Sequence, residues 1–160
     1  IMNTKDILLF ESGDGGEMAI VSNDLALTET ILQQAYLAMF GGNIEANTIG
    51  NEIATQERFD YWANSLLWSD EYPKQFNSNT ERILQNVVLN SSGRLEIIQS
   101  IELDLKYLKS IVNIEIEVYI QEINKVEMQI SFTKKNNLEN KTLILVYDNA
   151  RNELITQETI

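Results

Sequence analysis

The side chains in this sequence that could do chemistry are carboxylates. Four glutamates, Glu115, Glu117, Glu122 and Glu127, lie close together in the chain, and a pair of carboxylates is the usual machinery of glycoside hydrolysis. That reaction needs one carboxyl group in a dry pocket, which raises its pKa so that it can act as an acid. The alternating pattern around these glutamates places them on the wet side of a predicted sheet. We therefore predict that they are not catalytic.

Other routes to catalysis lack their partners. Histidine and cysteine are both absent from the 160 residues, which removes the commonest general base, the thiolate nucleophile and the usual transition-metal ligands. Ser12, Ser91 and Ser92 have no base to activate them. The acidic glycine-rich turn at residues 11–17 lacks the spaced ligands and the distal glutamate of a calcium-binding EF-hand. We expect no enzyme activity, no metal site and no cofactor.

Three side chains are candidates for contacting a partner protein. Trp62 and Trp68 lie in residues 43–77, a long loop without periodicity that also contains the only proline. These tryptophans either plug the loop onto the core or anchor a partner, because aromatic residues dominate binding hot spots. Arg94 stands just before a predicted helix, where it is either a solvated surface residue or an ion-pair clamp on a partner's carboxylate.

The elements that position these residues follow from the spacing of apolar side chains. Apolar residues at helical intervals predict a helix over residues 95–108. Its stripe consists of Ile97, Ile101, Leu105 and Leu108, widened by Leu95 and Ile98. Residues 114–120 and 126–132 then alternate apolar and polar side chains, which predicts an antiparallel hairpin. We expect the helix to pack on the apolar face of this hairpin, leaving the acidic face to solvent or a partner.

The remaining elements complete an α+β domain. Residues 28–40 predict a helix, and Ser78 with Glu81 fits a capping box that begins another helix, ending near residue 90. Short strands are expected at residues 6–10, 18–21 and 142–147, a turn at residues 22–24 leads into residues 25–27, and residues 148–160 form either an edge strand or a loose tail. The sequence thus predicts a single domain over residues 1–160, with helices packed on a mainly antiparallel sheet, an N-terminal β-hairpin and C-terminal antiparallel strands.

The charge of the chain excludes some partners. The formal net charge is −12, and a strongly acidic surface repels phosphate backbones, so we expect no nucleic-acid ligand. No apolar run approaches the roughly 20 residues of a membrane span, and the start lacks the layout of a signal peptide. We expect no membrane partner and a cytoplasmic location when the chain is made. An acidic protein-binding or inhibitor module that uses its negative face is one functional alternative.

The order of several short motifs resembles the Mu-type phage tail protein family. These motifs are D-I-L-L-F (6–10), N-D-L-A-L (23–27), L-A-M-F-G-G (37–42), Y-W-A-N (61–64), L-L-W (66–68) and D-L-K-Y-L (104–108). The similarity covers roughly residues 6–132. Y-W-A-N stands where that family has W-W-G-D, so Tyr61 replaces one tryptophan and Ala63-Asn64 replaces the Gly-Asp pair.

That family is similar to the baseplate wedge proteins of contractile tails, also called sheath initiators. The resemblance implies a small structural α+β subunit of a virion tail baseplate, assembled in the host cytoplasm. Its implied partners are other baseplate or tail proteins and the first sheath layer, which in the wider group meets an exposed edge of the wedge protein. The wider group also carries a Glu-Pro-Arg motif, where this chain has Ser92-Gly93-Arg94-Leu95 without the proline. Arg94 is therefore the candidate for a similar clamp.

Overall fold

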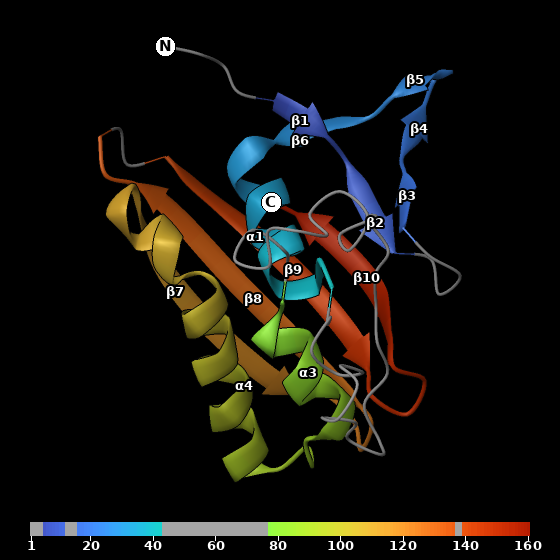
Figure 1. Cartoon of the computed structure of the whole chain (residues 1–160), viewed down its shortest axis with the longest axis vertical. Coiled ribbons are helices and arrows are strands. Elements are labelled where there is room, and N and C mark those ends of the chain that lie inside the picture. The colour runs from blue at the N-terminus through green and yellow to red at the C-terminus, as the bar shows by residue number, and fades with distance from the viewer. Residues whose placement is uncertain (1–4, 12–15, 43–76, 137–138) are drawn as a thin grey trace, which may run out of the picture.

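A computed structural model describes residues 5–11, 16–42, 77–136 and 139–160 (Figure 1). The predicted α+β fold is confirmed: short N-terminal strands lead into helices, and a four-stranded antiparallel sheet closes the chain. Most of the predicted loop at residues 43–77 lies outside the described residues, and Trp62 and Trp68 lie outside them as well.

The sheet has the strand order β10-β9-β8-β7. Its strands are β7 (Val112–Ile120), β8 (Lys125–Lys134), β9 (Asn140–Asp148) and β10 (Glu153–Thr159). The β7–β8 hairpin runs from the pair Val112↔Lys134 to the pair Ile120↔Val126, so both alternating segments form strands as predicted. Residues 148–160 contribute the edge strand β10, paired with β9 through a register shift between Leu154 and Thr156.

The core lies on the face of the sheet that the helices cover. Along β8 the inward side chains Val126, Met128, Ile130 and Phe132 are all buried, and β9 adds Leu143, Leu145 and Tyr147. Fully burying one such side chain stabilises the fold by about 1.5–3 kcal/mol. Helices α1 (Thr30–Phe40), α3 (Asn79–Asn86) and α4 (Ser91–Asp104) lie against this face (Figure 1).

Helix α4 begins earlier than its apolar stripe indicates. Asn90 caps it by accepting a 2.9 Å hydrogen bond from the Gly93 N–H, and it ends at Asp104, followed by the 3₁₀ helix η3 (Lys106–Ser110). The predicted stripe residues are buried: Ile97, Ile101, Leu105 and Leu108. Leu95, expected to widen the stripe, is instead 55% exposed.

Helix α3 begins at its predicted position but without the predicted cap. Ser78 precedes the helix, yet its side chain makes no capping hydrogen bond, and the helix ends at Asn86 rather than near residue 90. The Asp104 carboxylate takes the place of the cap. It accepts hydrogen bonds from the N–H groups of Asn79 (3.0 Å) and Thr80 (2.8 Å) and from both of their side chains (2.8 and 2.7 Å).

The N-terminal strands form three two-stranded ladders that meet at one point. The pairs are β1 (Lys5–Ile7) with β6 (Leu27–Glu29), β2 (Leu9–Glu11) with β3 (Gly16–Met18), and β4 (Ile20–Val21) with β5 (Asp24–Leu25). At the junction Leu8 donates its N–H to Ala26, Ala26 donates to Ala19, and Ala19 donates to Leu8, over 2.8–2.9 Å. This closed ring of hydrogen bonds pairs the backbone N–H and C=O groups of the three residues that lie between the ladders.

Candidate partner interface

Arg94, the predicted clamp, binds its own sheet. It lies in the first turn of α4, and its Nε donates a 2.8 Å hydrogen bond to the carbonyl oxygen of Val118 on the edge strand β7. The guanidinium therefore ties the helix to the strand beside it. This contact satisfies one backbone acceptor on that edge of the sheet and makes pairing with another chain there less favourable.

The stem that carries the segment of Trp62 and Trp68 is tightly fixed. The Ser78 N–H donates a 2.8 Å hydrogen bond to the carbonyl oxygen of Gly42, so the two ends of the segment lie side by side. Burial raises the pKa of Asp104, which holds the start of α3, while the hydrogen bonds from Thr80 and Asn79 lower it. Hydrogen bonds among described residues thus hold together the two points at which residues 43–76 leave and rejoin the described chain.

Strand β10 presents the other edge of the sheet. Thr142 and Ile160 exchange both backbone hydrogen bonds (2.8 and 2.9 Å), which marks them as a hydrogen-bonded antiparallel pair. Such pairs alternate with pairs whose backbone groups point away from the neighbouring strand. The N–H and C=O groups of Gln157 and Thr159 therefore point away from β9, and β9 is the strand that pairs with β10 among the described residues.

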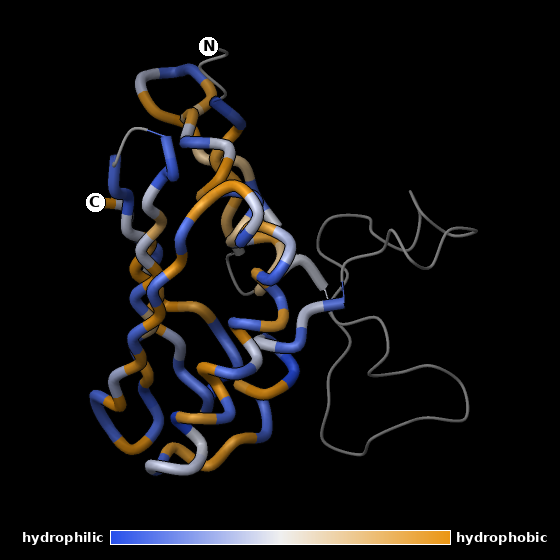
Figure 2. The backbone as a smooth tube through the Cα atoms, turned by 90° about the vertical axis from the view of Figure 1, so that its left-hand side faces the viewer, coloured by the Kyte–Doolittle hydropathy of each residue, from blue (hydrophilic) through white to orange (hydrophobic). Residues whose placement is uncertain are grey.

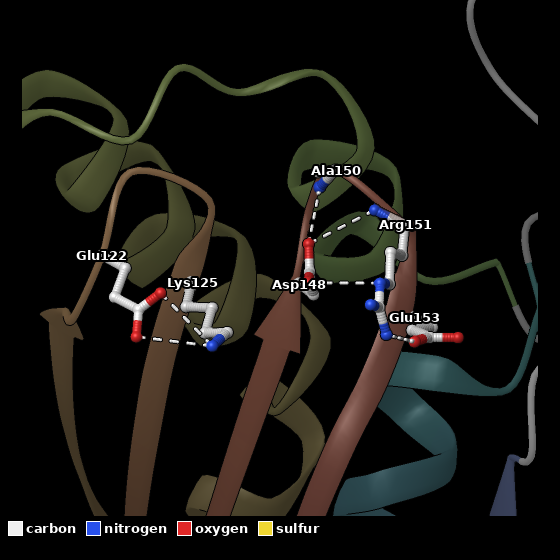
Figure 3. Close-up of polar contacts among 6 residues, drawn as sticks. All are labelled: Glu122, Lys125, Asp148, Ala150, Arg151 and Glu153. Atoms are coloured by element: carbon white, nitrogen blue, oxygen red, sulfur yellow. Dashed lines mark hydrogen bonds and ion pairs between the residues drawn. The ribbon is translucent and has the colours of Figure 1, made fainter.

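The hairpin that leads into β10 is held by polar contacts (Figure 3). The Asp148 carboxylate accepts the N–H groups of Ala150 (2.9 Å) and Arg151 (3.3 Å). The Arg151 guanidinium in turn lies 3.9 Å from Asp148 and 3.4 Å from Glu153. The carboxylate thus organises the turn at residues 149–152, so β10 enters the sheet in a defined register.

A groove runs between β10 and the N-terminal strands. It has a volume of ≈ 350 Å³, and its walls come from the first and the last strands of the chain. The lining residues are Leu8, Phe10, Leu27, Thr28, Leu154, Ile155, Gln157 and Thr159. Apolar and polar groups line the groove in nearly equal measure, and it adjoins the residues of β10 whose backbone groups point outward. Sequence reasoning missed it, because its two walls lie more than 120 residues apart in the chain.

The face of the sheet away from the helices is acidic, as predicted. Glu115 and Glu117 on β7 are exposed, and Glu127 on β8 is half-buried. Glu117 accepts a 2.8 Å hydrogen bond from the Tyr119 hydroxyl, which raises the pKa of that tyrosine. Glu127 accepts from the side chains of Gln121 and Gln129. Within the described part of the chain, none of these three carboxylates forms an ion pair with a lysine or arginine.

The described residues contain no group of three or more His, Cys, Asp or Glu side chains arranged to hold a metal ion. No described helix is both long and apolar enough to cross a membrane. Comparison with known proteins found no matching family model, no matching curated protein and no matching solved structure.

Proposed function

We propose that this chain is a structural subunit of the baseplate of a contractile phage tail or a phage-like device. In this role it binds other baseplate proteins and the first sheath layer, and it has no catalytic activity. The motifs at residues 6–10, 23–27, 37–42 and 61–68 support the proposal through their order, and the α+β fold agrees with it.

The observation that carries the proposal is the outer edge of β10. Backbone groups of Gln157 and Thr159 point away from β9, next to a groove lined by both apolar and polar side chains. An extended segment of a partner can pair with such an edge through its main chain, while every second side chain enters the groove. An assembly protein needs this kind of surface, whereas an enzyme needs a closed pocket with perturbed titratable groups.

Sedimentation tests the proposal. The chain is detected in lysate of its native producer after induction of resident prophage, and the lysate is sedimented. We expect the chain to pellet with tail-sized particles at a small fixed ratio to sheath protein. A chain that stays in the soluble fraction as a monomer or small complex contradicts the baseplate role.

A pair of variants tests the edge itself. Gln157→Pro removes an N–H that points outward, leaves the hydrogen bonds to β9 intact, and stands where proline is tolerated. We expect this variant to fold and to stay out of the particles. Gln157→Thr keeps the N–H and suits a strand, so we expect it to pellet like the wild type. If both variants enter the particles equally, the β10 edge is not the contact.

The uncovered acidic face favours a second candidate function, an acidic module that binds a basic partner. Glu115, Glu117 and Glu127 lack ion-pair partners among the described residues, so their charge is available to a partner. Salt distinguishes the two functions, because exposed charge pairs weaken as ionic strength rises, whereas backbone pairing and apolar burial do not. A soluble complex that dissociates between low and moderate salt supports the module.

A further inference from the structure

Strand β10 turns its side chains alternately to the two faces of the sheet. Gln157 is the register partner of the buried Leu145, so its side chain points to the helix side, where it lines the groove. Thr159, opposite the buried Leu143, does the same. Glu158 lies between them and points to the uncovered face. Hydrophilic and hydrophobic residues alternate in this way along the strands of the sheet (Figure 2). A strand added beside β10 therefore meets the groove on one face and Glu158 on the other.

The Glu158 carboxylate has no positive partner within the sheet. On the uncovered face it lies directly opposite Ile144, and its diagonal neighbours on β9 are Thr142 and Val146. All three neighbours are uncharged, and no lysine or arginine among the described residues forms an ion pair with Glu158. Within the sheet, a cation can therefore reach this carboxylate from the open edge of β10.

Glu158 occupies a position at which an added antiparallel strand comes especially close. Thr142 and Ile160 exchange both backbone hydrogen bonds. Two residues further along, Ile144 and Glu158 form a pair of the same kind, so β9 already uses the backbone groups of Glu158. The residue that an added strand places opposite Glu158 is therefore in a non-hydrogen-bonded pair, in which the Cα atoms lie about 4.5 Å apart instead of about 5.5 Å. A like charge there is destabilising, and an opposite charge is stabilising.

The groove sets a different requirement for the side chains on either side of that residue. No charged side chain lines the groove, and a charge buried there without a partner is unfavourable. The side-chain oxygen of Gln157 is buried and accepts no hydrogen bond from a described residue. A hydroxyl or amide side chain opposite Gln157 on the added strand can donate to this oxygen. The groove therefore favours uncharged inward side chains, one of them a hydrogen-bond donor.

We infer that the edge of β10 selects an antiparallel strand that carries lysine or arginine opposite Glu158, flanked by uncharged side chains that enter the groove. The side chain opposite Gln157 carries a hydroxyl or an amide. Glu158 is the residue that determines this specificity. The inference rests on the pairing at the β10 edge that the proposed function uses, and it deepens that function because it specifies the sequence of the partner segment.

Two synthetic peptides test the inference on the full chain. Both are capped at their ends and carry a fluorescent label, and they differ only at the central residue: Val-Thr-Val-Lys-Thr-Thr-Val and Val-Thr-Val-Glu-Thr-Thr-Val. In an antiparallel pairing, the threonine after the central residue lies opposite Gln157. Fluorescence anisotropy measures the dissociation constant of each peptide. We expect the lysine peptide to bind the wild type about fivefold more tightly than the glutamate peptide, and this difference to shrink as salt is added.

Charge reversal on the protein supplies the controls. Glu158→Lys should reverse the preference, so that the glutamate peptide binds more tightly than the lysine peptide. Glu122→Lys makes the same change in charge on the β7–β8 turn, away from β10, and should leave the preference as in the wild type (Figure 3). Gln157→Pro should abolish the binding of both peptides, because it removes an N–H that points outward.

Equal affinity of the two peptides for the wild type, a preference that Glu158→Lys leaves unchanged, or no binding of either peptide overturns the inference. Binding that survives Gln157→Pro lies at another site and overturns it as well. Sedimentation judges the baseplate role separately. A chain that pellets with tail-sized particles but does not distinguish the peptides keeps that role and refutes the inference. A chain that stays soluble yet prefers the lysine peptide supports the inference and counts against the baseplate role alone.

Discussion

The Asp104 carboxylate joins the end of α4 to the start of α3, and Asp104→Asn tests how much this joint stabilises the fold. Each carboxylate oxygen accepts two hydrogen bonds, Oδ1 from Asn79 and Oδ2 from Thr80. Asparagine keeps one oxygen and replaces the other with an NH₂ group. The charge is lost, and one backbone N–H then faces a donor; the side chain beside it, the Thr80 hydroxyl or the Asn79 amide, can turn to accept from the NH₂ group.

The size of the effect follows from these contacts. A hydrogen bond to a charged group contributes about 1.5–3 kcal/mol, and a buried donor left unpaired costs about 1–3 kcal/mol. The burial that raises the pKa of Asp104 also makes the charged group unfavourable there, so part of this contribution is already offset. We expect a net loss of about 2–4 kcal/mol in the free energy of unfolding. At roughly 2–4 °C per kcal/mol for a chain of this size, the melting temperature falls by about 5–15 °C.

Urea and thermal unfolding followed by circular dichroism measure the change. Glu102→Gln is the matched control, since it makes the same carboxylate-to-amide change on the same helix. Glu102 is about half exposed and lies 4.0 Å from Lys109, so its loss should change stability by less than about 0.5 kcal/mol. If the two variants lose the same small amount, Asp104 does not act as the cap of α3, and the reasoning above is wrong.

Three other predictions follow from single contacts. Gly93→Ala should lower the free energy of unfolding by about 2–4 kcal/mol, because the new Cβ would lie 2.0 Å from the Val88 carbonyl oxygen. This clash outweighs the gain in helix propensity. An unchanged melting temperature contradicts this prediction. Arg94→Met should lower the free energy of unfolding by about 1 kcal/mol, and the variant should still pellet with the particles. If Arg94 instead clamped a partner, the variant would keep its stability and fail to assemble. Replacing residues 43–76 with four Gly/Ser residues should leave a folded chain, up to about 2 kcal/mol more stable in urea through the shorter closed loop. A large destabilisation there would instead support the tryptophans as core plugs.

The sequence predicted those parts of the fold in which neighbouring residues decide the structure. The stripe of α4 and the alternation of β7 and β8 follow from burial on one face, and both form as expected. The cap of α3 could not be predicted, because Asp104 lies 24 residues beyond Thr80 and competes successfully with Ser78. The prediction that Leu95 widens the buried stripe was wrong, because helical spacing fixes which residues share a face, while packing decides how wide the covered face is.

The candidate interfaces were predictable only in part. The acidic face of the sheet follows from alternation alone, and the edge position of residues 148–160 was one of two options. The partner of Arg94 is a backbone carbonyl on β7, which no sequence pattern marks. The groove depends on the meeting of the first and last strands.

The two edge strands of the sheet, β7 and β10, differ in the contacts that cover their outer backbone groups, and this affects which proteins can pair with them. Exposed edges invite pairing with any strand, including one from another copy. Helix α4 lies alongside β7, and the Arg94 guanidinium donates a hydrogen bond to the Val118 carbonyl oxygen. On β10, no comparable contact from a described residue covers the outward groups of Gln157 and Thr159, but Glu153 and Glu158 lie in the same strand. Two β10 strands from separate copies would bring these like charges together, which is destabilising across strands. A neutral or basic strand meets no such repulsion, so the charges on this edge favour pairing with a different protein over pairing with a second copy.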